Sequence, residues 1–156
     1  LPDSVLNKTY LIEYITNRKI TLKEFFAEQT NELCYIDFWA SWCLPCLKEI
    51  PMLKKAYEKY NAYGLNFIGI SADDNVVEWR NAIEKHNLAL YPQVLSVLPE
   101  SAGYELFFSE LEDVGGRYEV ESIPCFILIN DKMEIVARWQ HFSEETFAYL
   151  DSLFER

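Results

Sequence analysis

Residues 33–46 read LCYIDFWASWCLPC, and this stretch decides how the chain folds. Its first eight residues, Leu33 to Ala40, are apolar or aromatic apart from Asp37, which is typical of a buried strand. After Cys43 the apolar residues recur with a period near 3.6, which indicates a helix. Cys43 and Cys46 therefore lie where a buried strand passes into a helix.

Two thiols separated by two residues can close a small disulfide ring at the start of a helix. The first thiol lies beside backbone N–H groups that have no partner within the helix, and these groups favour the thiolate over the thiol. Pro45 fits the first helical turn, where a missing N–H costs little. Pro51 lies farther in and cannot donate to the carbonyl of Leu47, so we expect a kink there.

A CxxC pair is also half of a common zinc site, but zinc needs two further ligands, usually at a matching close spacing. The remaining candidates are scattered along the chain and form no second pair: Cys34, Cys125, His86 and His141. We therefore predict a redox pair and no metal. We expect both histidines at the surface or at helix ends, without a partner that indicates catalysis.

The rest of the chain extends this strand–helix unit in both directions. Upstream we predict a hairpin over Thr9–Tyr14 and Lys19–Leu22, followed by a short amphipathic helical turn. Downstream we predict these elements: a helix ending at Gly64, a strand at Leu65–Ile70, a helix at Val76–His86, a helix around Tyr104–Leu111, a hairpin of Phe126–Ile129 with Ile135–Trp139, and a terminal helix at Glu144–Phe154. This order favours an α/β fold around a mixed sheet.

Composition limits the classes of function. The 156 residues suit one domain, and with half of them hydrophobic they can bury a sizeable core. The formal net charge of -11 disfavours nucleic acids and anionic membrane surfaces. No stretch has the length of apolar sequence that a transmembrane helix needs. The chain begins with Leu1 and without a signal-peptide pattern, so we expect a mature or excised form.

The stretch from Asp37 to Cys46 resembles the active-site signature of thioredoxins. The continuation from Leu47 to Pro51 resembles the extracytoplasmic thiol–disulfide oxidoreductases related to TlpA and ResA. The segments FIGIS at 67–71 and YEV at 118–120 match that group in order and rough spacing.

This resemblance implies a thioredoxin fold, a central mixed β-sheet flanked by helices, with an N-terminal β-hairpin extension. It implies a single domain over residues 1–156, with the extension at 1–32 and the core at 33–156. The core would carry an insertion around 91–117, where the resemblance is weakest.

The resemblance also implies roles for individual residues. Cys43 would be the attacking thiol and Cys46 the resolving thiol of a redox-active disulfide. Pro124 would be a cis-proline that docks substrate backbone, Ile123 would bond an incoming peptide through its backbone, and Trp42 would contact substrate. The partners would be a protein disulfide substrate and an upstream thiol donor protein, with no cofactor and no nucleic acid. Family likeness places the chain outside the cytoplasm, in a bacterial periplasm or cell envelope.

This chain differs from each branch of the family because it carries two carboxylates, each of which matches a different branch. Asp37 matches the buried acid of thioredoxin, where relatives of ResA often have Asn, and Glu49 matches the carboxylate that the ResA-like branch places near its cysteines. We assign both to the catalytic set, while Glu49 also fits a solvated helix residue. We expect burial to raise the pKa of Asp37.

Two further cysteines lie in the predicted strands. Cys125 follows Pro124 directly, and it fits either a small buried residue or a third thiol near the site. Antiparallel pairing would hold Cys34 and Cys125 roughly 15 Å apart at about 3.3 Å per residue. We therefore predict no disulfide between them.

Together these observations predict an enzyme, a protein-disulfide oxidoreductase that acts by dithiol exchange. Two alternatives remain open. One is a peptide-binding or chaperone-like module that uses the Pro124 groove, and the other is a peroxidase on the same fold.

Overall fold

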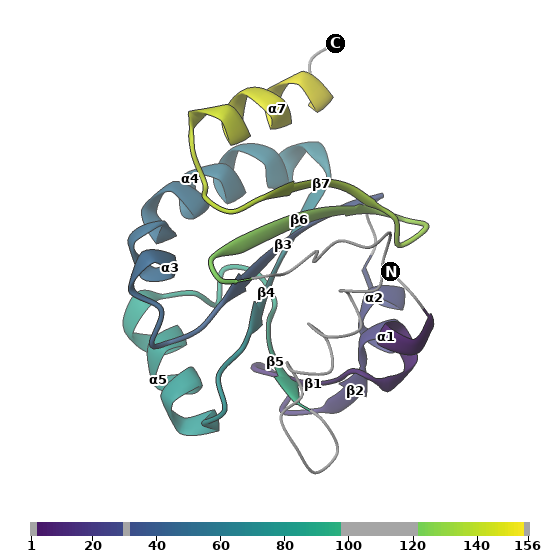
Figure 1. The fold of residues 1–156 in the computed structure, drawn as a ribbon, viewed down its shortest axis with the longest axis vertical. Helices are drawn as coiled ribbons and strands as arrows, with labels where there is room; N and C mark the ends of the chain where they lie inside the picture. Colours follow the sequence, from purple (N-terminus) through teal and green to yellow (C-terminus); the bar gives the residue numbers. More distant parts are fainter. Residues whose placement is uncertain (1–2, 30–31, 98–121, 155–156) are drawn as a thin grey trace.

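The computed structural model describes residues 3–29, 32–97 and 122–154. Its strands form one mixed sheet in the order β2-β1-β5-β4-β3-β6-β7 (Figure 1). Their bounds are β1 (Tyr10–Glu13), β2 (Lys19–Thr21), β3 (Leu33–Trp39), β4 (Leu65–Ser71), β5 (Gln93–Val97), β6 (Cys125–Asn130) and β7 (Ile135–Trp139). The helices are α1 (Asp3–Lys8), α2 (Leu22–Ala27), α3 (Leu44–Lys48), α4 (Ile50–Tyr60), α5 (Val76–His86) and α7 (Glu144–Phe154), with a 3-10 turn at Asn61–Tyr63.

The centre of the sheet is parallel and its edges are antiparallel. Strands β3, β4 and β5 run in one direction, whereas β6 and β7 on one side and β1 and β2 on the other are added antiparallel. The predicted α/β architecture with a mixed sheet and an N-terminal hairpin is therefore confirmed.

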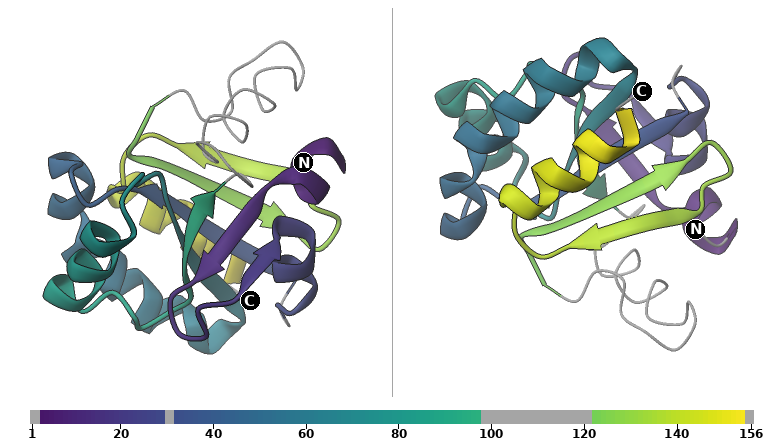
Figure 2. Two further views of the ribbon diagram at one scale, coloured as in Figure 1. Left: turned by 90° about the horizontal axis from the view of Figure 1, so that it is seen from below. Right: turned by 90° about the horizontal axis from the view of Figure 1, so that it is seen from above.

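Helices cover the two faces of the sheet unequally. Helices α3, α4, α5 and α7 lie on one face, and the short α1 and α2 lie on the other (Figures 1 and 2). The alternation of side chains along β3 fits this division. Ile36 and Phe38 pack in the cluster that contains residues of α1 and α2, whereas Tyr35 and Trp39 pack beneath the helices of the opposite face.

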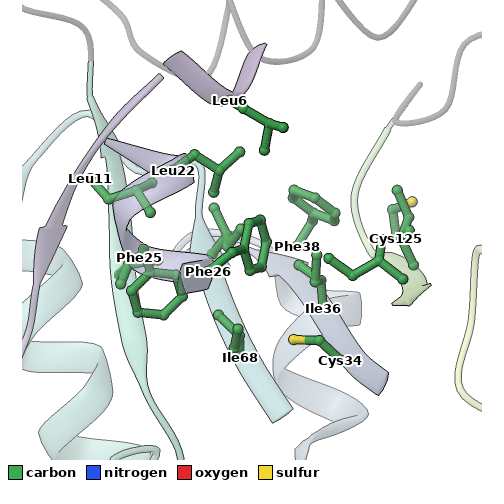
Figure 3. Packing of buried hydrophobic residues seen from close by; sticks show 14 residues of the cluster. Leu6, Leu11, Leu22, Phe25, Phe26, Cys34, Ile36, Phe38, Ile68 and Cys125 are labelled. Atoms are coloured by element: carbon green, nitrogen blue, oxygen red, sulfur yellow. The ribbon is translucent and has the colours of Figure 1, made fainter. Parts of the chain in front are cut away.

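The core on the α1–α2 face joins the N-terminal segment to the sheet (Figure 3). Leu22, Phe25 and Phe26 of α2 are buried against β3, and a capping box starts their helix. In that box Thr21 accepts from the Glu24 N–H while the Glu24 carboxylate accepts from the Thr21 N–H. The N-terminal segment is thus packed into the same core as the central strands.

Strand β5 is an element that the sequence pattern did not predict. It occupies the start of the segment expected to be an insertion around 91–117, and it lies inside the sheet between β4 and β1. The hairpin β1–β2 extends the central sheet through this strand. The helix predicted around 104–111 lies outside the described residues.

The predicted kink near Pro51 is present as a break between two helices. Helix α3 ends at Lys48, Glu49 has φ -86° and ψ -8°, and α4 begins at Ile50. Pro51 then stands in the first turn of α4, where its missing N–H is tolerated. Over the described ranges, none of the helices is long and apolar enough to cross a bilayer.

Candidate active site

Cys43 and Cys46 form a disulfide at the start of α3, with their Cα atoms 5.3 Å apart. Cys43 is the N-cap of the helix, and its sulfur accepts from the Cys46 N–H at 3.3 Å. Both cysteines are largely buried, whereas Trp42 and Leu44 beside them are 61% and 60% exposed. The disulfide therefore lies just below a surface formed by two exposed apolar side chains.

The loop before Cys43 is held by Asp73, a buried carboxylate in the segment after β4. Its oxygens accept from the Ser41 N–H at 3.0 Å, the Ser41 hydroxyl at 2.5 Å and the Ser71 hydroxyl at 2.6 Å. The Ser71 hydroxyl in turn accepts from the Asp73 N–H at 2.9 Å. A buried charge with several donors is well compensated. Asp73 therefore fixes Ser41, two positions before Cys43, a role that the sequence analysis missed.

A second buried contact fixes Trp39, which packs in the same cluster as the two cysteines. The indole Nε1 donates to Gln93 Oε1 at 3.1 Å, and Gln93 Nε2 donates to the Leu88 carbonyl at 3.0 Å. The Gln93 side chain lies directly over Gly69, where any Cβ would overlap its amide group. Because Gly69 has no side chain, Gln93 of β5 can occupy this space and hold Trp39.

Asp37 lies on the face of β3 that points toward the helix carrying the cysteines. Its neighbours at alternate positions, Tyr35 and Trp39, pack in the clusters of that face, and Asp37 itself is 8% exposed. Burial raises the pKa of Asp37 to about 8, and the nearby charge of Glu49 adds to the rise. The predicted direction of this pKa shift is confirmed.

Glu49 is turned inward rather than toward solvent. Its side chain is 14% exposed, and Oε1 lies 3.1 Å from His141 Nδ1 and 3.3 Å from the Phe142 N–H. Burial raises the pKa of Glu49, and the contacts with His141 and Phe142 partly offset this rise. The reading of Glu49 as a solvated helix residue is therefore wrong. His141 lies at the surface, as expected, with its side chain 70% exposed, and its partner there is the Glu49 carboxylate.

The segment before β6 reaches the cluster that contains the disulfide. The Ile123–Pro124 peptide bond is cis, as the sequence analysis predicted. Ile123 packs against the cluster that contains Cys43 and Cys46. Cys125 pairs with Phe38 in the register and lies in the cluster on the α1–α2 face, so it belongs to the core. Cys34 pairs with Ile129, four positions farther along, which excludes the disulfide that the sequence analysis also rejected.

A groove of about 400 Å³ begins at the exposed Trp42 and runs along one side of α5. The groove is lined by Ser41, Trp42, Leu47, Glu78, Asn81, Ala82, Lys85 and His86. Among the described residues, no group of three or more His, Cys, Asp or Glu side chains has the arrangement of a metal site.

Comparisons with known proteins agree with this geometry. The thioredoxin-like family profile matches residues 31–135, about two thirds of the chain. The thiol-disulfide oxidoreductase ResA of Bacillus cereus (strain ZK / E33L) is 22% identical over 146 residues, which cover 92% of this chain and 74% of that protein.

Solved structures share the fold. The thioredoxin domain of a thiol-disulfide oxidoreductase from Bacteroides vulgatus superposes with a TM-score of 0.68 at 23% identity, covering 99% of both chains. StoA from Bacillus subtilis superposes with a TM-score of 0.61 at 22% identity, covering 94% of this chain and 98% of that one. The matched profile, the shared fold and the position of the Cys43–Cys46 disulfide show that the chain belongs to the thioredoxin-like family.

Proposed function

We propose that this thiol–disulfide oxidoreductase reduces disulfide bonds in proteins, with Cys43 as the attacking thiol and Cys46 as the resolving thiol. The observation that carries this proposal is the disulfide itself, formed at the N-terminus of a helix between two exposed apolar side chains. The Cys46 N–H that points at the Cys43 sulfur stabilises a negative charge on that sulfur once the pair is reduced. This environment favours a thiolate at Cys43.

The reaction takes two exchange steps. The Cys43 thiolate attacks one sulfur of the substrate disulfide, forms a mixed disulfide and releases the first substrate thiolate, which takes up a proton. Cys46 then loses its proton and attacks the Cys43 sulfur, which closes the enzyme disulfide and releases the second substrate thiolate. The substrate gains two electrons and two protons, and an upstream thiol donor returns the pair to the dithiol form.

Cys46 needs a base in the second step, because the thiol form attacks poorly. Asp37 and Glu49 are two carboxylates largely removed from solvent on this side of the sheet, and the charge of Glu49 acts on Asp37. With a pKa of about 8, Asp37 can accept and release a proton near neutral pH. We assign the carboxyl pair Asp37–Glu49 to proton transfer with Cys46.

Substrate would bind over the disulfide. Trp42 supplies an exposed aromatic surface beside Cys43. Ile123 of the cis Ile123–Pro124 segment packs against the cluster that contains Cys43 and Cys46. The groove along α5 opens from Trp42, so it would receive the polypeptide that flanks the substrate cysteines. On the resemblance to the proteins related to TlpA and ResA, we place this reaction outside the cytoplasm, in a bacterial envelope.

Reduction of insulin in the presence of dithiothreitol tests the proposal. The wild-type chain should accelerate precipitation of the insulin B chain, and the Cys43→Ala/Cys46→Ala double variant should match the rate without protein. A double variant as active as wild type would refute dithiol exchange. Binding of reduced, unfolded protein that survives in the double variant, without any reductase activity in wild type, would favour the peptide-binding alternative.

A further inference from the structure

Glu49 is held by a contact that joins distant parts of the chain. Its Oε1 lies 3.1 Å from His141 Nδ1 and accepts the Phe142 N–H at 3.3 Å. Both residues belong to the segment between β7 and α7, more than 90 positions along the chain. The other oxygen, Oε2, is buried and makes no hydrogen bond with any described residue. The carboxylate thus has one oxygen fixed by the β7–α7 segment and one left in the interior.

Four titratable groups bear on this carboxylate directly or through Asp37. Asp37 and Tyr35 face it from β3, His141 faces it from the β7–α7 segment, and Tyr91, which precedes β5, acts through Asp37. Asp37, Tyr35 and Tyr91 are buried, whereas the His141 side chain is 70% exposed. Among these groups, the imidazole is the one in open contact with water.

We propose that His141 is a positioning residue for disulfide exchange, holding the Glu49 carboxylate in place and passing protons between it and solvent. This inference rests on the proposed function, because the proton concerned is the one that Cys46 loses and regains. An imidazole suits the task since its two ring nitrogens can bind and release protons at different places.

The proton balance closes over one catalytic cycle. When Cys46 attacks the mixed disulfide, its proton passes to the carboxyl pair and from Glu49 to Nδ1 of His141, while Nε2 releases a proton to water. When the upstream donor reduces the enzyme disulfide, Cys46 leaves as a thiolate and regains a proton by the reverse path. The imidazole then returns to its starting tautomer.

Two substitutions separate the parts of this role. His141→Ala removes the contact and the proton path. His141→Asn places an amide close to the position of Nδ1, so it can keep the hydrogen bond to Glu49 but cannot relay protons. Because His141 is exposed, both variants should fold, which their thermal unfolding midpoints would verify.

The most direct readout is the pKa of Glu49, measured from the ¹³C chemical shift of its side-chain carboxyl carbon. The titration would run from about pH 3 to about pH 10, a range that spans the ordinary pKa values of carboxylic acids and thiols. His141→Ala should raise the pKa of Glu49, and His141→Asn should bring it back toward wild type. In the same variants we would measure reduction of a disulfide peptide against pH. His141→Ala should lower the rate at neutral pH by a factor of about 10², the low end for assisted proton transfer. His141→Asn should stay slow, because it keeps the hydrogen bond but cannot relay protons.

A Glu49→Gln background supplies the control. There, His141→Ala should have no further effect on the rate, because the group on which it acts is gone. Equal slowing in both backgrounds would overturn the proposal, and so would an unchanged titration of Glu49 in His141→Ala. If wild type reduces no disulfide at all, the proposed function fails, whereas the titration still reports whether His141 governs Glu49.

Discussion

At the scale of single residues, Asp37 is a carboxyl group whose burial in its ionised form would cost free energy. A carboxylate among apolar and aromatic neighbours loses its hydration, and the folded chain compensates by holding the proton. Such a residue costs stability at the pH where the unfolded chain would ionise it. The proposed role in proton transfer would explain why an acid occupies this position.

Replacement of Asp37 by Asn should stabilise the folded chain at neutral pH. The pKa of Asp37 is about 8 in the folded chain and near 3.8 when unperturbed, so the folded state keeps a proton that the unfolded state releases. Stability from this group is therefore complete below the lower value and is lost as pH rises toward the higher one, by up to about 1.4 kcal/mol per pH unit. Urea midpoints of wild type and Asp37→Asn should coincide near pH 4 and diverge by pH 8, with the variant more stable.

The same substitution should slow the second exchange step. Asn cannot take the Cys46 proton, so disulfide reduction should fall by a factor of about 10² or more at neutral pH. Stopped-flow measurement of mixed-disulfide decay would separate this step from the first attack. A variant that is less stable at pH 7 and fully active would identify Asp37 as an ordinary structural acid.

At the scale of elements, the site depends on strands that carry none of its reactive groups. Strand β5 supplies Gln93, which holds Trp39, and Gly69 of β4 supplies the space that Gln93 needs. The segment after β4 supplies Asp73, which holds Ser41. The position of the CxxC pair is therefore set by neighbouring strands as well as by its own helix.

Gly69→Ala should destabilise the chain, because the added methyl group would displace the Gln93 amide from two buried hydrogen bonds. We expect a loss of roughly 1–3 kcal/mol, the cost of leaving buried polar groups unpaired. Denaturant unfolding of Gly69→Ala, Gln93→Ala and the double variant would measure it. The double variant should be more stable than the sum of the single effects predicts, whereas strict additivity would mean that Gln93 does not fill that space.

Asp73→Asn should loosen the loop that precedes Cys43. The amide can replace only some of the acceptor positions that Ser41 and Ser71 use, so we expect a loss of roughly 1–3 kcal/mol. Asp74→Asn is the matched control, since Asp74 is the adjacent acid and is exposed. A thermal melt in which the two variants shift the midpoint equally would contradict the anchoring role of Asp73.

The sequence pattern predicts the regular elements well and the supporting contacts poorly. The bounds of α5 and α7 agree with the predicted helices at Val76–His86 and Glu144–Phe154, because their apolar residues recur at helical spacing over three turns. Strand β5 could not be predicted in this way, because Gln93 and Ser96 interrupt its apolar pattern and its partner β1 lies some 80 residues earlier. Both polar residues are buried in the fold.

Within the candidate site, local sequence predicts the reactive residues but not their supports. The CxxC spacing identifies Cys43 and Cys46, and a lone acid in an apolar strand makes Asp37 a candidate. The contact between Glu49 and His141 joins residues 92 positions apart, and no local sequence pattern predicts it. Only the packing of the β7–α7 segment against the break between α3 and α4 brings them together.

At the scale of the whole molecule, the net charge of -11 should shape the choice of substrate. A field of this sign draws cationic chains toward the surface and repels anionic ones, and salt screens both effects. We therefore expect kcat/KM for a lysine-rich disulfide peptide to fall as ionic strength rises from about 0.01 to 1 M, and that for a glutamate-rich peptide to rise. Equal salt dependence for the two peptides would show that the overall field plays no part.

The central claim is that Cys43 attacks substrate and Cys46 resolves the intermediate. Cys46→Ser and Cys43→Ser, each reduced and then mixed with a disulfide-bonded protein, test it directly when the products are analysed by mass spectrometry without reductant. Cys46→Ser should accumulate a mixed disulfide through Cys43, because no thiol remains at position 46 to release it. Cys43→Ser should accumulate little, because the N–H that favours a thiolate points at the sulfur of residue 43, at the N-cap, and comes from Cys46 itself. Trapping through Cys46 with none through Cys43 would contradict the account.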